Sequence, residues 1–139
     1  MTAEKAVTDA YAAYWDVSTR AAGLPRDQGW AVLAPYSEPE HTEQLLERVG
    51  KWQRKGIEPW GYVVAHAQSV KVNGSTARLL DCQDASHAAV AKAKTHAVIS
   101  GTTGSPDVHI AADMQHDPDG RWRLKQLTIL ETPCSAQRS

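Results

Sequence analysis

The sequence predicts an α+β domain in which helices come first and an antiparallel sheet follows. Apolar residues before Gly56 recur at helical spacing, whereas the second half alternates polar and apolar residues between an Asn-Gly and an Asp-Pro-Asp-Gly turn. A chain of 139 residues has the usual size of one domain. We therefore expect residues 1–139 to form a single domain without repeats or linkers.

The first predicted helix carries one apolar stripe and stops at Gly23 and Pro25. The stripe consists of Val7, Tyr11, Tyr14, Ser18 and Ala21. A short apolar run, residues 30–33, predicts a brief second helix. Ser37 and Glu40 have the spacing of a capping box, so a third helix is expected to begin with Ser37 as its N-cap. Its apolar positions are Leu45, Leu46, Val49 and Trp52, and Gly56 ends it.

The remaining elements are predicted strands. Residues 61–86 form a hairpin that reverses at Asn73-Gly74. The alanine-rich segment after it fits a helix or a strand, and we expect a strand at residues 93–100. Two further strands, residues 108–116 and 121–131, are joined by the turn at Asp117-Pro118-Asp119-Gly120.

The register of the first hairpin decides which side chains share a face. A two-residue Asn-Gly loop pairs Val72 with Ser75 and, further out, His66 with Asp81. The face that contains these two residues is apolar near the turn and polar towards its middle, which suits the wall of a ligand cavity. On this face we expect Val64, Gln68 and Leu79 to line the cavity.

His66 and Asp81 are the strongest candidates for chemistry. Directly opposed residues have Cβ atoms about 4.5–5.5 Å apart, and a carboxylate at that distance raises the pKa of an imidazole and fixes its tautomer. A general base uses this arrangement, but the same pair also occurs as a structural contact or a pocket lining, and the sequence leaves both open. Asp113 is a second inward carboxylate if the following turn keeps an even register; otherwise it points outward.

Composition excludes several classes of function. Lys and Arg number 15 against 16 Asp and Glu, a formal net charge of -1, so no basic excess favours nucleic acid binding. No apolar stretch approaches the roughly 18 residues of a membrane span. The six histidines lack the spacing of a metal-binding pair, so we expect neither a metal nor another cofactor.

The segments `GSTARLLDCQDAS` and `DGRWRLKQLTILETPC`, together with the helical first half, resemble the nuclear transport factor 2-like superfamily, which includes ketosteroid-isomerase-like proteins. The resemblance runs from about Ala6 to Cys134 and is strongest to small extracytoplasmic domains of actinobacterial lipoproteins and secreted proteins. It implies a strongly bent antiparallel sheet wrapped around the first helix, forming a cone whose mouth holds a small ligand.

Isomerases and dehydratases of the superfamily place a Tyr with carboxylates, or a His with an Asp, inside the cone. Residues of these types lie in roughly the corresponding region here, namely Tyr11, Tyr14, His66, Asp81 and Asp113, although no complete catalytic motif of the family matches residue by residue. We expect Tyr11, Trp15 and Asp113 to line the pocket, with Tyr14 as the candidate acid beside His66 and Asp81.

The superfamily's extracytoplasmic members commonly bridge two cysteines at the positions of Cys82 and Cys134. The alternative is a pair of free thiols in a cytoplasmic protein.

Three functions follow as expectations. The first is a noncatalytic extracytoplasmic domain, secreted or lipid-anchored, that binds a small apolar ligand or a protein. The second is a small lyase or isomerase that acts on an apolar substrate, with His66 as base, Asp81 as its orienting group and Tyr14 as acid. The third is a structural or assembly subunit that forms a homodimer through its sheet.

Overall fold

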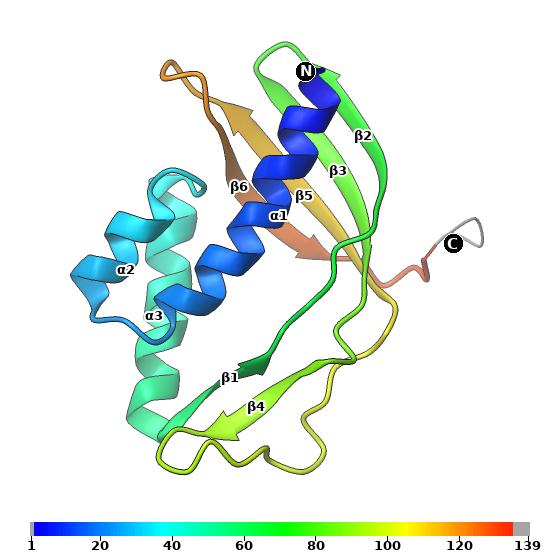
Figure 1. Ribbon diagram of the computed structural model, residues 1–139. Helices are drawn as coiled ribbons and strands as arrows, with labels where there is room; N and C mark the ends of the chain where they lie inside the picture. The colour runs from blue at the N-terminus through cyan, green and yellow to red at the C-terminus, as the bar shows by residue number, and fades with distance from the viewer. Residues whose placement is uncertain (1, 135–139) are drawn as a thin grey trace.

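The computed structural model describes residues 2–134, and Figure 1 shows helices packed on one side of a curved antiparallel sheet. This arrangement confirms the predicted α+β class. The helices are α1 (Ala3–Ala21), α2 (Arg26–Leu33) and α3 (Pro39–Lys55). The strands are β1 (Ile57–Gly61), β2 (Ala67–Asn73), β3 (Thr76–Gln83), β4 (Ala88–Lys92), β5 (Val108–His116) and β6 (Trp122–Ile129). None of the described helices is long and apolar enough to cross a membrane.

Helix α1 lies across the four-stranded part of the sheet, whose order is β2-β3-β5-β6 (Figure 1). Thr2 caps its first turn, because the Thr2 Oγ1 atom accepts a hydrogen bond from the Lys5 backbone N–H at 3.1 Å. The predicted stripe of α1 is buried, with Val17 added to it. It packs on sheet residues that alternate along β3, β5 and β6, namely Ala77, Leu79, Ala112, Met114 and Leu124.

The predicted capping box of the third helix is wrong. Helix α3 starts at Pro39, and its N-cap, Glu38, makes no side-chain capping bond. The preceding segment is fixed by β6 instead, since the Glu38 N–H donates to the Leu124 carbonyl oxygen at 2.9 Å. Ser37 is buried there, where its Oγ accepts a hydrogen bond from the Thr42 hydroxyl at 2.8 Å. The predicted end is confirmed, because Gly56 takes the left-handed conformation at φ 72°.

Four strands form one long hairpin with a bend. Its first arm consists of β1 and β2, and its second arm consists of β3 and β4. An isolated bridge between Val64 and Asp84 joins the β1–β4 ladder to the β2–β3 ladder. The bend begins at Gly61, which has φ 78°, and a Cβ atom built there would lie 1.9 Å from the His87 carbonyl oxygen. Only glycine fits this position, and the bend curves the sheet around the helices (Figure 1).

The expected strand at residues 93–100 is wrong by several residues. The strand β4 ends at Lys92, and the chain turns back at His96, whose φ is 61°. Val98 then forms an isolated bridge with Ala91. The location of β4 depends on its partner β1, a strand that the sequence pattern did not predict, since Ala88–Lys92 lies opposite Ile57–Gly61 in the long hairpin.

The register of the β2–β3 turn differs from the prediction by two residues. Asn73 pairs with Thr76 and Val72 with Ala77, so Gly74 and Ser75 are the two turn residues. A shift of two residues keeps every side chain on its predicted face. A β-bulge between Ala67 and Ser69 then changes the alternation, and Ala67, rather than His66, lies opposite Asp81.

A disulfide joins Cys82 of β3 to Cys134, with a Cα–Cα distance of 5.7 Å. This pairing confirms the one that the family resemblance implied. Disulfides form and persist in oxidising compartments, so the bridge is typical of a protein outside the cytoplasm.

Candidate ligand-binding pocket

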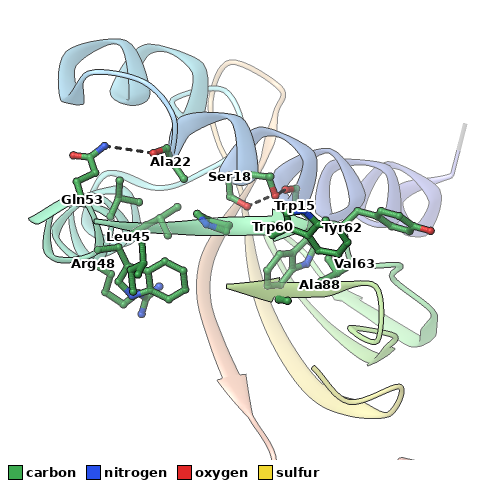
Figure 2. Close-up of a pocket in the computed structure, with 17 residues that line it drawn as sticks. Trp15, Ser18, Ala22, Leu45, Arg48, Gln53, Trp60, Tyr62, Val63 and Ala88 are labelled. Atoms are coloured by element: carbon green, nitrogen blue, oxygen red, sulfur yellow. Dashed lines mark hydrogen bonds between the residues drawn. The ribbon is translucent and has the colours of Figure 1, made fainter. Parts of the chain in front are cut away.

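An apolar pocket of about 250 Å³ lies between α1, α3 and the β1–β4 end of the long hairpin (Figure 2). Its aromatic lining consists of Trp15, Trp52, Trp60 and Tyr62. Its aliphatic lining consists of Ala22, Leu45, Val49, Ile57, Pro59, Val63, Ala88 and Ala89. Ser18, Thr19, Arg48, Gln53 and Gly61 complete it. Pockets with a mostly apolar lining and a few polar groups are the usual sites for small ligands, although this one is just below their common range of about 300–1,000 Å³.

Neighbouring apolar residues of α3 face the core on one side and the pocket on the other. Leu46 is buried in the core beside Gly29 of α2. Leu45, Val49 and Trp52 follow at spacings of four and three residues and line the pocket. One residue, Gly56, separates α3 from β1, so the two walls they form are held next to each other by the chain itself.

The mouth of the pocket carries aromatic side chains that water reaches. Trp60 is 45% exposed and Tyr62 is 58% exposed. The Tyr62 ring stacks on the His87 ring, with centroids 5.1 Å apart. Partly exposed aromatic groups beside an apolar pocket are typical of a binding site, because a ligand that enters removes their surfaces from water.

Trp15 forms the inner aromatic wall and carries a buried donor. Its ring meets those of Tyr11 and Tyr14 edge-on, with centroids 6.2 Å and 5.4 Å away. Its Nε1 atom is buried and makes no hydrogen bond of ordinary geometry among the described residues, although its N–H lowers the pKa of the neighbouring Tyr11 hydroxyl. Native proteins rarely leave such donors unsatisfied.

Arg48 brings a positive charge to the pocket and influences two core residues behind it. The Tyr14 hydroxyl and the His41 Nε2 atom share a hydrogen bond of 2.6 Å. Burial, and then the Arg48 charge, lower the pKa of His41 to about 4, so this imidazole is neutral at physiological pH. Burial raises the pKa of Tyr14, so its hydroxyl is also neutral.

The predicted His66–Asp81 side-chain pair does not form. Asp81 is fully buried, and its Oδ1 atom accepts a hydrogen bond from the backbone N–H of His66 at 2.7 Å. Its Oδ2 atom accepts one from the Tyr11 hydroxyl at 2.5 Å. The imidazole Nδ1 of His66 instead lies 3.2 Å from the Cys82 carbonyl oxygen. The bulge at Gln68 causes this difference, because it turns the His66 side chain away from the face that carries Asp81.

Burial raises the pKa of both members of the Tyr11–Asp81 contact. Burial raises the pKa of the Asp81 carboxyl, and the hydrogen bonds from Tyr11 and His66 oppose that effect. Burial, with the nearby Asp81 charge, raises the pKa of Tyr11. Neither residue is reached by solvent or lines the apolar pocket, so the contact joins α1 to β3 inside the core.

The other predicted site residues also lie apart from the pocket. Tyr14 bonds to His41, and Leu79 is fully buried in the core. Val64 is 37% exposed beyond the bend, and Gln68 lies at the bulge. Of the expected lining residues, Trp15 is the one that lines this pocket.

Asp113 points outward, contrary to its assignment as an inward carboxylate. Its Oδ1 atom lies 3.0 Å from the Arg78 Nη1 atom in a partly exposed ion pair. Arg78 alternates with the buried Ala77 and Leu79, so this pair occupies the side of the sheet that faces away from α1. The register beside the turn already excludes the inward position, because Met114, rather than Asp113, lies opposite Leu124.

Sequence reasoning missed the contributions of α3 and β1 to the pocket. Leu45, Val49 and Trp52 were read as part of the core stripe of their helix. Trp60 was the available signal, because it lies between Gly56, where the predicted third helix ends, and Gly61, where the predicted hairpin begins, so neither element gives it a core position.

No group of histidine, cysteine and carboxylate side chains within residues 2–134 is arranged to hold a metal ion.

No protein-family model matches this chain, and no curated protein sequence matches it. Solved structures do match in fold. The intermembrane space region of the chloroplast protein ARC6 superposes with a TM-score of 0.65 at 11% identity, over 95% of this chain and 99% of that one. A conserved protein from Planctomyces limnophilus superposes with a TM-score of 0.53 at 10% identity, over 91% of this chain and 97% of that one. At these identities the likeness concerns the fold alone.

Proposed function

We propose that the protein is a noncatalytic binding domain that works outside the cytoplasm and holds a small apolar ligand between α1, α3 and β1. The observation that carries this proposal is the pocket itself. Four aromatic side chains gather around about 250 Å³ of space, and two of them, Trp60 and Tyr62, stay largely exposed to water. Covering such surfaces with an apolar ligand is favourable at roughly 25 cal/mol per Å² of buried apolar area.

The arrangement of the polar side chains supports binding rather than catalysis. The three side chains expected to act together have different partners: Tyr14 contacts His41, His66 contacts a backbone carbonyl, and Asp81 accepts bonds from Tyr11 and a backbone N–H. Acid–base catalysis requires its groups to reach one reacting atom. The lyase or isomerase alternative gains no support from this geometry.

Two features support the location outside the cytoplasm and the superfamily that we propose. The Cys82–Cys134 disulfide suits an oxidising compartment. The bent hairpin around α1 suits the nuclear transport factor 2-like superfamily, whose members hold small ligands in the mouth of a cone. We therefore assign the chain to that superfamily as part of the same proposal.

Binding of a neutral apolar fluorophore tests the proposal. N-phenyl-1-naphthylamine is expected to bind at one saturable site, with a rise in its own emission and quenching of tryptophan fluorescence. Trp60→Ala removes an aromatic wall at the mouth and is expected to weaken binding about tenfold, which is typical for truncating an aromatic contact.

Ile129→Ala provides the matched control. Ile129 is an apolar residue with 71% exposure on β6, outside the pocket. This variant is expected to bind the fluorophore as the unmodified protein does. Equal loss of binding in both variants, or a fluorophore signal that never saturates, would contradict a defined site in the pocket.

A further inference from the structure

The lining of the apolar pocket carries one formal charge. Of the seventeen residues that line it, Arg48 is the one that is charged at neutral pH, and none of them is an Asp or Glu. Arg48 is exposed, so water reaches its guanidinium in the free protein. A ligand that covers the apolar walls beside it removes part of this water, which strengthens the attraction between the cation and an anionic group.

Arg48 has no acidic partner within the described chain. The positions one helical turn away on α3 hold Gln44, Leu45, Lys51 and Trp52, so no carboxylate is available at the spacing that forms ion pairs along a helix. The ion pairs formed by residues 2–134 involve other cations, and Arg48 takes part in none of them. Its five N–H donors are available to a ligand.

The charge and three of the four aromatic groups occupy different parts of the pocket, whereas Trp52 lies one helical turn from Arg48 on α3. Figure 2 shows Arg48 on the α3 side, beside Leu45. Trp60, Tyr62 and Trp15 gather at the opposite end, where β1 approaches α1. A ligand that fits both ends has an anionic head and an apolar body.

The number of cations limits the charge of that head. A single guanidinium matches a carboxylate through two parallel N–H···O bonds. A phosphate group carries about two charges at neutral pH and is usually held by further cations or by a helix N-terminus. The lining offers neither, because the pocket borders the C-terminal halves of α1 and α3.

We propose that the pocket binds an apolar monocarboxylic acid, with its carboxylate on Arg48 and its hydrocarbon part against Trp15, Trp60 and Tyr62. This inference rests on the proposed binding function and adds the chemical class of the ligand. Straight-chain alkanoates of medium length and small aromatic acids belong to that class.

Paired ligands of equal chain length test the inference separately from the function. Sodium decanoate and decan-1-ol are titrated below their aggregation concentrations, and each displaces N-phenyl-1-naphthylamine from the pocket. Decanoate is expected to bind at least about tenfold more tightly than decan-1-ol, because only the acid gains charge-assisted hydrogen bonds.

Variants of two arginines on the same helix locate the effect. Arg48→Met keeps an unbranched apolar stem and removes the charge. It is expected to weaken decanoate binding about tenfold and to leave decan-1-ol binding unchanged. Arg54→Met is the control, since it removes one positive charge from an exposed position of α3 outside the pocket lining and is expected to change neither affinity.

The two proposals fail in different ways. If the alcohol binds as tightly as the acid, or if Arg48→Met weakens both equally, the carboxylate assignment is wrong and the apolar binding function stands. If Arg54→Met weakens decanoate as much as Arg48→Met does, the preference reflects the overall charge and the assignment to Arg48 is wrong. If neither ligand nor the fluorophore binds, the binding function and the inference are both wrong.

Discussion

At the scale of single residues, the core of this protein depends on polar side chains that are buried with their partners. Asp81 satisfies both the Tyr11 hydroxyl and the His66 N–H, which ties α1 to β3 and to the segment before β2. Tyr14 and His41 connect α1 to α3 in the same way. A buried polar group without its partner costs roughly 1–3 kcal/mol, so these contacts also restrict how α1 can pack.

His41 makes the stability of the protein depend on pH. Because its pKa is lowered from 6.5 to about 4 in the folded state, the unfolded chain binds this proton first as the pH falls. The stability that the neutral imidazole provides is complete above pH 6.5 and is lost as the pH falls towards 4, by about 1 kcal/mol per pH unit. Urea denaturation at several pH values is expected to show a shallower loss in His41→Gln.

The exposed His116 provides the comparison for that measurement. His116→Gln is expected to keep the pH dependence of the unmodified protein, because its ring lies at the surface against Trp122. A His41→Gln variant that loses stability between pH 6.5 and pH 4 as steeply as the unmodified protein would contradict the role of this imidazole.

The sequence correctly predicted on which face of the sheet the side chains of β3 lie. It predicted the wrong face for side chains beyond a β-bulge. The alternation along β3 correctly assigned Ala77 and Leu79 to the core, and the shift of the turn by two residues left that assignment unchanged. The bulge at Gln68 reversed the alternation before His66. A bulge is stabilised by contacts with the rest of the sheet, here by the hydrogen bond from the His66 N–H to buried Asp81, and it leaves no mark in the local sequence.

At the scale of elements, the bend in the long hairpin builds the pocket. Residues before Gly61 pair in the β1–β4 ladder beside α3, whereas residues after the bend pair under α1. Tyr62 and Val63, at the bend itself, line the mouth of the pocket. The bend therefore determines the position of β1, which forms one wall of the pocket, relative to α1 and α3.

Gly61→Ala tests the bend. The substitution combines a left-handed backbone, at φ 78°, with a Cβ atom 1.9 Å from the His87 carbonyl oxygen, so the two strands must separate. We expect a loss of at least about 3 kcal/mol in the free energy of unfolding, measured by urea denaturation.

Gly56→Ala is the matched control, because its φ is 72° and nothing lies within 4 Å of the added Cβ. It keeps the backbone penalty without the clash and is expected to cost about 1 kcal/mol. Similar losses in the two variants would show that the close approach to His87 has no energetic consequence.

Patterns within a short stretch of sequence predicted the helix or strand formed by that stretch. Elements without such a pattern were not predicted. The spacing of Val7, Tyr11 and Tyr14 predicted α1, and Gly56 marked the end of α3. The strands β1 and β4 are five residues each and stabilise each other, so neither has a strong pattern of its own. Pockets formed between such elements are correspondingly hard to derive, and the residues from β1 were missed for this reason.

At the scale of the whole molecule, the disulfide is the longest-range covalent constraint. It joins positions 52 residues apart, and closing a loop of that length stabilises the folded state by about 4 kcal/mol in the chain-entropy description. The reduced protein is therefore expected to unfold at a lower urea concentration than the oxidised protein, with a difference of about that size in the free energy of unfolding.

Comparing the same chain before and after reduction leaves all side chains in place. The double variant Cys82→Ala with Cys134→Ala serves as a second check and is expected to be unaffected by the reductant. A reduced protein that unfolds at the same urea concentration as the oxidised one would contradict a stabilising role of the bridge. The family resemblance predicted this pairing, which the spacing of two cysteines alone does not determine.

The bridge also determines how mechanical tension passes through the molecule. A pull applied between Met1 and a point beyond Cys134 runs along the backbone to Cys82 and crosses directly through the two sulfur atoms. The strands β4, β5 and β6 lie inside the closed loop, so the covalent path of that force bypasses them. Stretching would extend the chain from α1 to Cys82, while the backbone between the two cysteines kept its length.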